Sequence, residues 1–140
     1  MKRILVSACL LGLCCRYDGG TKPCEKVLAL AKDNILVPVC PEQLGGLSTP
    51  RTPSERQPVG GVLSKDGRDV SENYARGAEA ALKIARLAEV DYAILKARSP
   101  ACGKGEIYDG SFSGKTTAGN GVAAELLMSE GIAVFSDEEI

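Results

Sequence analysis

The sequence predicts an α/β fold: a small three-layer, Rossmann-like domain with a mostly parallel sheet of about four strands, crossover helices and a hairpin. Short apolar runs alternate with helical patterns along the chain, and this alternation is typical of parallel strands joined by crossover helices. Apolar residues make up 44% and charged residues 25% of the 140 residues, as in globular proteins. A chain of this length can form one core, so we expect a single domain over residues 1–140.

Four apolar runs are the predicted strands of this sheet. They span residues 4–6, 35–39, 92–96 and 132–135. The second run contains Pro38, which cannot donate a hydrogen bond to a neighbouring strand. We therefore expect this strand to lie at an edge of the sheet or to end early.

Three helices are predicted between these strands. The clearest covers about residues 71–88, where alanine and leucine recur at helical spacing and indicate close packing on a sheet. Asp69 and Glu72 are placed to form a capping box at its start. Shorter helices are predicted over residues 23–33 and 121–130.

The remaining segments are predicted to be turns and loops. Lys65-Asp66-Gly67 is typical of a hairpin turn, so residues 62–64 are expected to pair with residues 69–70. Residues 45–58 are rich in proline and glycine, and residues 107–120 are rich in glycine, serine and threonine. Loops of this length in a small domain are usually functional or disordered.

The absence of histidine sets the strongest limit on the chemistry. The chain contains no His, which excludes Ser-His-Asp and Cys-His catalysis and metals held by imidazole. Acid–base work is left to Glu, Asp, Lys, Tyr or Cys. The net charge of −1 and the absence of Trp give no global signature of nucleic-acid binding.

The N-terminal apolar run is the one candidate for a targeting segment. It is too short for a signal peptide, whose core needs about seven residues or more. No other run approaches the ~18 apolar residues of a membrane span. We therefore expect a cytoplasmic protein with no membrane partner.

Three of the six cysteines follow predicted strands. Cys9, Cys40 and Cys102 each come after an apolar run, and ligands of parallel sheets bind beyond the carboxyl ends of the strands. Without histidine, three converging thiolates favour zinc or an iron–sulfur cluster and leave one metal position open. The alternative is that they are small buried apolar residues; disulfides are less expected in a chain that can bury a core. The remaining cysteines are interpreted as packing residues or spare thiols: Cys14, Cys15 and Cys24.

Two polar residues accompany these cysteines. Glu42 lies two positions after Cys40 and is well placed to act as a general base, the alternative being a surface ion pair. Ser99 precedes Pro100 at the same predicted edge. Its hydroxyl can orient a substrate or relay a proton, or it can simply cap a turn.

A phosphate-binding role is predicted for residues in the two long loops. Arg51, Ser111 and Ser113 carry the donors that such a site needs. Residues 110–116 resemble a P-loop but are one residue short, and no predicted strand directly precedes them. We therefore reject a nucleotide-hydrolysing P-loop.

Six motifs are spread over nearly the whole chain. They are Ser7-Ala8-Cys9-Leu10-Leu11-Gly12; Arg16-Tyr17-Asp18-Gly19; Cys40-Pro41-Glu42 with Gly45-Gly46-Leu47 and Thr49-Pro50-Arg51; Lys96 with Ser99-Pro100 and Cys102-Gly103; Ile107-Tyr108-Asp109-Gly110; and Gly119 with Gly121-Val122. Together they resemble the DUF523 family, whose characterised members are thiouracil desulfidases.

This resemblance implies a [4Fe-4S] cluster bound by three cysteines, at the positions of Cys9, Cys40 and Cys102. It also implies that the fourth iron binds the sulfur of a thiocarbonyl, and that the catalytic carboxylate and serine of the family match Glu42 and Ser99.

The implied reaction is a non-redox, hydrolytic desulfuration of 4-thiouracil or its nucleosides and nucleotides. It yields uracil compounds and sulfide. The tRNA substrates are linked mainly to forms fused to a second domain, which nothing in this chain resembles, so a small-molecule substrate is expected. The alternatives are a non-catalytic iron–sulfur protein and a zinc-binding protein.

Overall fold

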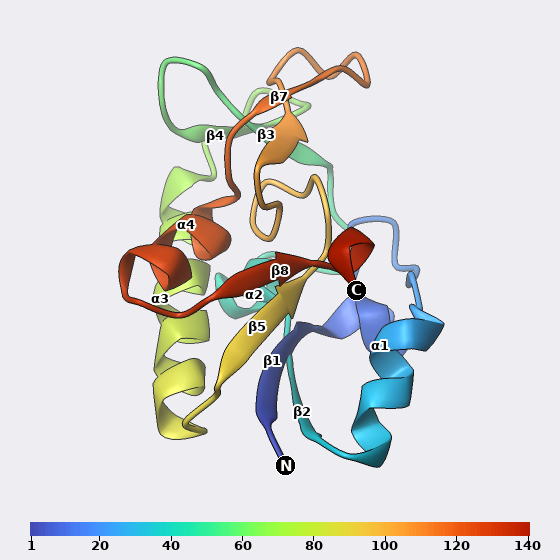
Figure 1. Cartoon of the computed structure of the whole chain (residues 1–140). Coiled ribbons are helices and arrows are strands. Elements are labelled where there is room, and N and C mark those ends of the chain that lie inside the picture. Colours follow the sequence, from blue (N-terminus) through green and yellow to red (C-terminus); the bar gives the residue numbers. More distant parts are fainter.

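A four-stranded parallel sheet forms the centre of the molecule (Figure 1), in a computed structural model that describes all 140 residues. The strands are β1 (Arg3–Ser7), β2 (Ile35–Val39), β5 (Tyr92–Leu95) and β8 (Val134–Ser136), in the order β2-β1-β5-β8. Every neighbouring pair is parallel, which confirms the predicted α/β class. The proline-containing strand β2 lies at the edge, where a missing ladder donor is tolerated.

Helices cover both faces of this sheet and complete three layers (Figure 1). Helix α1 (Glu25–Ala29), continued by the 3₁₀ turn η2 (Leu30–Lys32), lies on one face. Helices α3 (Ser71–Leu87) and α4 (Val122–Ser129) pack against each other on the opposite face. Because successive strand residues point to opposite faces, the sheet contributes to two apolar cores, one under each helical layer.

The strand order reverses between β1 and β5. After β1 the chain pairs β2 on one side, and then crosses to place β5 on the other side of β1. The connections that leave β1 and β5 therefore diverge, which opens a crevice beyond the carboxyl ends of these strands. Open α/β sheets bind their ligands in this crevice.

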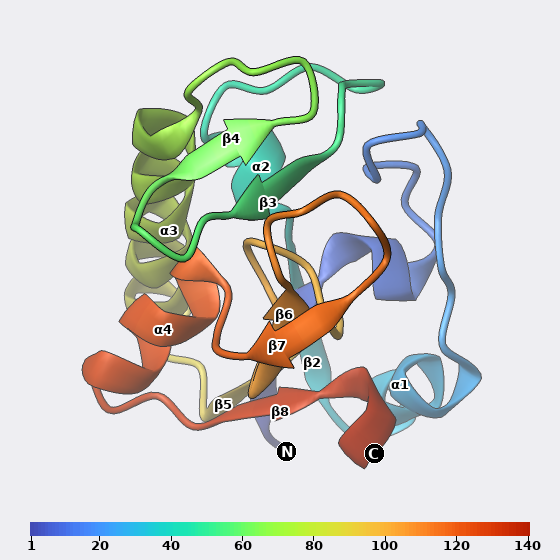
Figure 2. The ribbon, with the colours of Figure 1, turned by 90° about the horizontal axis from the view of Figure 1, so that it is seen from above.

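Two short antiparallel hairpins lie above that end of the sheet (Figures 1 and 2). The first pairs β3 (Ser54–Arg56) with β4 (Val62–Ser64), and the second pairs β6 (Glu106–Tyr108) with β7 (Thr116–Ala118). The second hairpin occupies a segment predicted to be entirely loop. Its strands are only three residues long, too short to be distinguished from a loop by alternation.

The predicted partner of residues 62–64 is only partly correct. Their main partner is β3, and a single isolated bridge between Leu63 and Asp69 remains of the predicted pairing. The expected capping box at the start of α3 is wrong. Asp69 instead accepts a 2.9 Å hydrogen bond from the amide of Ser71, and Val70 is the N-cap residue without a side-chain cap.

Glycines allow the short helix α2 (Pro41–Leu44) to contact α3 closely. A Cβ atom added to Gly77 would lie 1.9 Å from the carbonyl oxygen of Pro41, and one added to Gly45 would lie 2.0 Å from that of Asn73. Only glycine fits at such contacts. This packing fixes the position of α2 and of the residues at its start.

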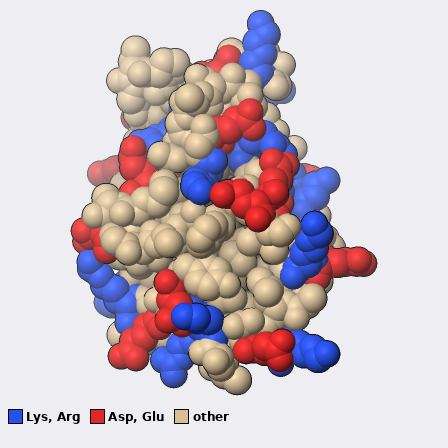
Figure 3. All heavy atoms as spheres, viewed as in Figure 1, with Lys and Arg blue, Asp and Glu red and all other residues tan.

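The molecular surface carries charges of both signs. Figure 3 shows Lys and Arg interspersed with Asp and Glu on the face viewed, with no broad area of one sign. No helix of the structure combines the length and the apolar character that are needed to cross a bilayer.

Candidate active site

A cavity of about 640 Å³ lies at the carboxyl ends of the parallel strands. Six residues singled out from the sequence line it together: Cys9, Cys40, Glu42, Arg51, Ser99 and Cys102. They come from three separate connections, which follow β1, β2 and β5. The fold therefore brings into one site residues that are far apart in the sequence.

The three cysteines sit directly beyond the strand ends. Cys9 lies in the 3₁₀ turn η1 (Ala8–Leu11) that follows β1, Cys40 joins β2 to α2, and Cys102 lies in the loop after β5. Cys9 and Cys102 are buried and Cys40 is half-buried. All six cysteines of the chain are free thiols, so no disulfide competes for these sulfur atoms.

The electrostatic environment of these thiols is uneven. The pKa of Cys9 is lowered, chiefly because of a hydrogen bond with the Cys15 thiol. The pKa of Cys40 is raised, chiefly because of its hydrogen bond with Cys15 and then by burial. Burial raises the pKa of Cys102 to about 12. A bound metal centre supplies the positive charge that such buried sulfur atoms need to become thiolates.

The spacing of these ligands bears on the kind of metal centre. No group of three or more Cys, Asp or Glu side chains is close enough to bind a single metal ion. In a four-iron cluster each cysteine binds a different iron atom, so its ligands are more widely separated than those of one zinc ion. Two buried thiols and one half-buried thiol around a cavity, without imidazole, therefore fit an iron–sulfur cluster better than zinc.

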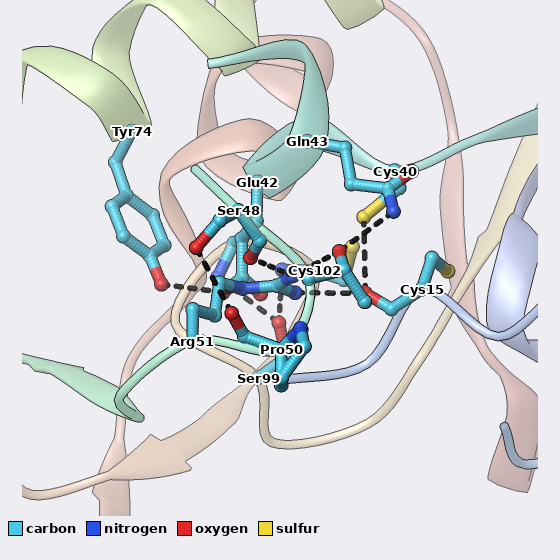
Figure 4. Close-up of polar contacts among 12 residues, drawn as sticks. Cys15, Cys40, Glu42, Gln43, Ser48, Pro50, Arg51, Tyr74, Ser99 and Cys102 are labelled. Carbon is cyan, nitrogen blue, oxygen red and sulfur yellow. Dashed lines mark hydrogen bonds and ion pairs between the residues drawn. The ribbon is translucent and has the colours of Figure 1, made fainter. Parts of the chain in front are cut away.

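A buried polar network holds Glu42 at the side of the cavity (Figure 4). Its Oε1 accepts a 2.7 Å hydrogen bond from the hydroxyl of Tyr74 and a 3.2 Å hydrogen bond from Nε of Arg51. Its Oε2 has no hydrogen-bond partner within the protein. Burial raises the pKa of Tyr74, and the charge of Glu42 raises it further, so this phenol remains a donor. The carboxylate is thus held by one oxygen while the other is left for a group in the cavity.

Most of the hydrogen-bond donors of Arg51 are used by other groups of the protein. Its side chain is 6% exposed. Besides Glu42, it donates to Thr49 Oγ1 at 3.0 Å and to the carbonyl oxygens of Ser48 at 3.1 Å and Cys15 at 2.9 Å. A guanidinium has five N–H donors, so only one remains for a ligand. One of these hydrogen bonds holds Glu42, and the others tie the Ser48–Thr49 segment to the carbonyl of Cys15.

Ser99 shapes the turn that carries Cys102. Its Oγ accepts hydrogen bonds from the amides of Ala101 and Cys102 at 3.0 Å and 2.8 Å. This is the turn-capping arrangement, and the Ser99 side chain also forms a hydrogen bond with the Cys102 thiol. Ser7 supports the same sulfur, because its side chain hydrogen-bonds to the Cys102 thiol.

Ser111 and Ser113 lie apart from the cysteines. Both are exposed in the loop between β6 and β7, where their hydroxyl groups are 2.5 Å apart and Ser111 also contacts Asp109. Neither lines the cavity; Phe112 and Gly114 of the same loop line it instead.

An acidic turn at residues 137–139 braces the loop that carries Ser99 and Cys102. Asp137 accepts a 2.7 Å hydrogen bond from the amide of Ala97. Glu138 forms a bidentate pair with Arg98, with distances of 2.9 Å and 2.6 Å. These contacts fasten the loop to the segment that follows β8.

Sequence reasoning missed several residues of the site. Tyr74 has the spacing of a helix core residue and carries no other signal. Cys15 follows no predicted strand, so the sequence gives it no role at the site. In the structure it is buried, lines the cavity and forms hydrogen bonds with Cys9 and Cys40. The adjacent Arg16-Tyr17-Asp18-Gly19 motif was the available signal for this segment.

Fold and site together define a doubly wound α/β protein with a thiol-lined cavity at its topological switch point, suited to a metal centre. The chain belongs to the 2-thiouracil desulfurase family, whose model matches residues 4–139. This finding confirms the family resemblance seen in the sequence motifs.

Two individual proteins are similar over almost the full chain. The uncharacterized protein YbbK of Bacillus subtilis (strain 168) is 43% identical over 148 residues, which cover 98% of this chain and 97% of YbbK. The solved structure of the [4Fe-4S]-dependent thiouracil desulfidase TudS (DUF523Vcz) superposes with a TM-score of 0.93 at 43% identity. The superposition covers 100% of this chain and 93% of that chain.

Proposed function

We propose that this protein is a [4Fe-4S]-dependent desulfidase that hydrolyses the carbon–sulfur bond of 4-thiouracil or its nucleosides and nucleotides. The observation that carries the proposal is the convergence of three thiols and a braced carboxylate on one cavity. The likeness to a structure named as a [4Fe-4S]-dependent thiouracil desulfidase supports it.

We place the cluster beside the three thiols of the cavity. Cys9, Cys40 and Cys102 would each hold one iron of the cluster, which leaves one iron without a protein ligand. When bound, the cluster supplies a Lewis acid that prefers the soft sulfur of a thiocarbonyl to the oxygen of uracil.

Glu42 is the proposed general base. Its free Oε2 takes a proton from a water molecule, whose oxygen then attacks the ring carbon that carries the sulfur. Arg51 and Tyr74 hold Oε1 and so fix the direction of the carboxylate. The overall reaction exchanges C=S and H₂O for C=O and H₂S, so no electrons are gained or lost and no redox partner is needed.

Ser99 is the proposed second catalytic residue. Its oxygen accepts two backbone amides and its side chain forms a hydrogen bond with the Cys102 thiol, so its hydroxyl lies beside one of the proposed cluster ligands at the edge of the cavity. There it donates to the substrate ring and assists proton transfer.

Three lysines favour substrates that carry a phosphate. Lys22, Lys65 and Lys96 line the cavity, and none of their side chains is in an ion pair. Unpaired ammonium groups attract phosphate as point charges. The net charge of −1 gives no overall excess of basic residues of the kind that a tRNA would attract, so a small nucleotide is favoured over tRNA.

The test is anaerobic purification followed by a sulfide-release assay. We expect a brown protein with about four irons and four sulfides per chain, and the loss of both in Cys102→Ala. The loaded protein should release sulfide from 4-thiouracil or 4-thiouridine monophosphate, whereas Glu42→Ala should keep the cluster and lose most of the activity. A fully loaded protein that releases no sulfide from the base, the nucleoside or the nucleotide would contradict the proposal and favour a non-catalytic iron–sulfur protein.

A further inference from the structure

The loop between β6 and β7, residues 109–115, borders the cavity on the side away from the sheet. Figure 1 places this loop above the carboxyl ends of the parallel strands, and Figure 2 shows it from above near the middle of the molecule. Phe112 lines the cavity from this loop. The thiols and Glu42 line it from the sheet edge, so the loop that carries Phe112 and the proposed reacting groups border the same cavity.

Phe112 is not a core residue. It belongs to neither of the two apolar cores, and it is only half-buried. It is one of only two phenylalanines in the chain. An apolar ring of this size that contacts a cavity rather than a core is available to a ligand.

The backbone of Phe112 is held in a strained conformation. Its φ of 56° lies in the left-handed region, where a bulky L-residue is an outlier. Gly110 and Gly114 of the same loop, with φ of 95° and 80°, take such values without strain. A strained conformation persists only when the surrounding structure holds it, and such residues cluster at ligand sites.

Glu55 supplies the restraint. This residue of β3 is only 9% exposed, and its Oε1 accepts hydrogen bonds from the amides of Gly110 at 2.9 Å and of Phe112 at 3.1 Å. Hydrogen bonds from amides to a carboxylate are stronger than those to a neutral acceptor. The side chain of Gln57 adds a 3.3 Å bond to the carbonyl oxygen of Gly110. One buried carboxylate thus fixes the tip of the loop.

We propose that Phe112 stacks on the pyrimidine ring of the substrate, and that Glu55 is the positioning residue that fixes its ring over the site. This inference rests on the proposed function and identifies how its substrate is recognised. A planar, uncharged heteroaromatic ring is the partner that a phenyl ring binds through its face. Stacking leaves the edges of the pyrimidine free, so the same contact accepts the base with or without a sugar phosphate.

The first test compares steady-state kinetics of cluster-loaded variants with 4-thiouracil. Replacing a stacking aromatic residue weakens base binding, so Phe112→Leu should raise KM about tenfold while kcat changes less. Phe112→Tyr keeps an aromatic ring at this position and should have the KM of the wild type. The matched control is Phe135→Leu, because Phe135 is the only other phenylalanine; it packs edge-on against Tyr92 at 5.6 Å and does not line the cavity. This control should leave KM unchanged.

A binding measurement provides a readout independent of turnover. The chain has no tryptophan, so Phe112→Trp introduces a single tryptophan at the proposed stacking position, which can be excited selectively beside the tyrosines. Titration of the cluster-loaded variant with uracil should quench its fluorescence to saturation. Phe135→Trp should show no saturable change.

The role of Glu55 is tested by a pair of variants. Glu55→Ala removes both amide bonds and should raise KM as Phe112→Leu does. Glu55→Gln retains an oxygen at the position of Oε1 and should restore most of the wild-type KM. Equal KM values for wild type, Glu55→Ala and Glu55→Gln would contradict the positioning role.

The outcomes separate this proposal from the proposed function. If the wild type releases sulfide, but Phe112→Leu has an unchanged KM and Phe112→Trp is not quenched by uracil, the stacking role is overturned and the desulfidase function stands. If the wild type releases no sulfide but uracil quenches Phe112→Trp, ring stacking stands and the desulfidase function falls. If neither signal is seen, both proposals fall.

Discussion

The phenol of Tyr74 lies 2.7 Å from Oε1 of Glu42 and donates a hydrogen bond to it. The two residues are 32 positions apart, on α3 and at the start of α2. The contact exists because α2 approaches α3 closely over Gly77. A buried helix residue thereby becomes part of the proposed catalytic site.

Tyr74→Phe tests this contact. The substitution removes one hydrogen bond to the carboxylate and leaves the ring in place. Hydrogen bonds to charged groups contribute about 1.5–3 kcal/mol, so kcat should fall about tenfold while iron and sulfide content stay at wild-type values. Tyr92→Phe is the control, because the Tyr92 hydroxyl has no hydrogen-bond partner in the structure. Equal kcat values for the two variants would show that the contact does not support catalysis.

Arg51→Ala should destabilise the fold as well as the site. It leaves Glu42 without its ion pair and removes the donors to three oxygen atoms of the surrounding loops. Breaking such a buried pair should lower the free energy of unfolding by about 2–4 kcal/mol, measured by urea denaturation. Arg51→Lys should rescue it only in part, because an ammonium cannot reproduce the planar set of donors.

A surface ion pair provides the comparison for Arg51. Arg86 and Glu130 form a 2.7 Å contact with exposed side chains, so Arg86→Ala should change the free energy of unfolding by less than about 1 kcal/mol. If Arg51→Ala lowered the free energy of unfolding as little as Arg86→Ala does, the Arg51 guanidinium would be available to bind a ligand, as the sequence analysis predicts.

Gly77→Ala should displace α2. The added Cβ would lie 1.9 Å from the carbonyl oxygen of Pro41, a backbone atom that can move only with the helix. We expect a loss of about 3 kcal/mol or more in the free energy of unfolding, together with reduced cluster content because Cys40 adjoins α2. Glu79→Ala, at an exposed position of α3, should stay within about 0.5 kcal/mol of wild type. A Gly77→Ala variant of wild-type stability would contradict this packing.

Acid should loosen the turn at residues 137–139. A hydrogen bond from Arg98 lowers the pKa of Glu138. A hydrogen bond from the backbone amide of Ser136, followed by one from Lys104, lowers the pKa of Glu139. A lowered pKa in the folded state contributes stability above the ordinary glutamate value of 4.5. This contribution is lost as the pH falls through the folded-state pKa.

Thermal unfolding as a function of pH provides the measurement. The wild type should lose more stability than Glu138→Gln between pH 5 and pH 3, because the variant lacks one of the groups that must be protonated. Identical pH profiles for the two proteins would exclude a contribution from the Arg98–Glu138 pair.

The sheet and the strand-end cysteines were predictable because apolar runs encode local burial. The runs that contain Ile4, Ile35 and Ile94 became β1, β2 and β5, and the rule for parallel sheets placed the three cysteines at one edge. The hydrogen-bond partners of Glu42 could not be predicted, because a tyrosine at the spacing of a buried helix face indicates only a packing residue. Phe112 was hidden in a loop of small polar residues, and only its backbone conformation and its contacts distinguish it.

The three proposed cluster ligands, Cys9, Cys40 and Cys102, are 31 and 62 residues apart in the sequence. An unfolded chain therefore offers no local pair of ligands, and closing loops of this length in an unstructured chain is entropically unfavourable. Folding must come first and metal loading second, the reverse of a zinc finger, whose metal drives its folding. We therefore expect the chain to fold without its cluster, so that iron and sulfide can be loaded into the folded protein.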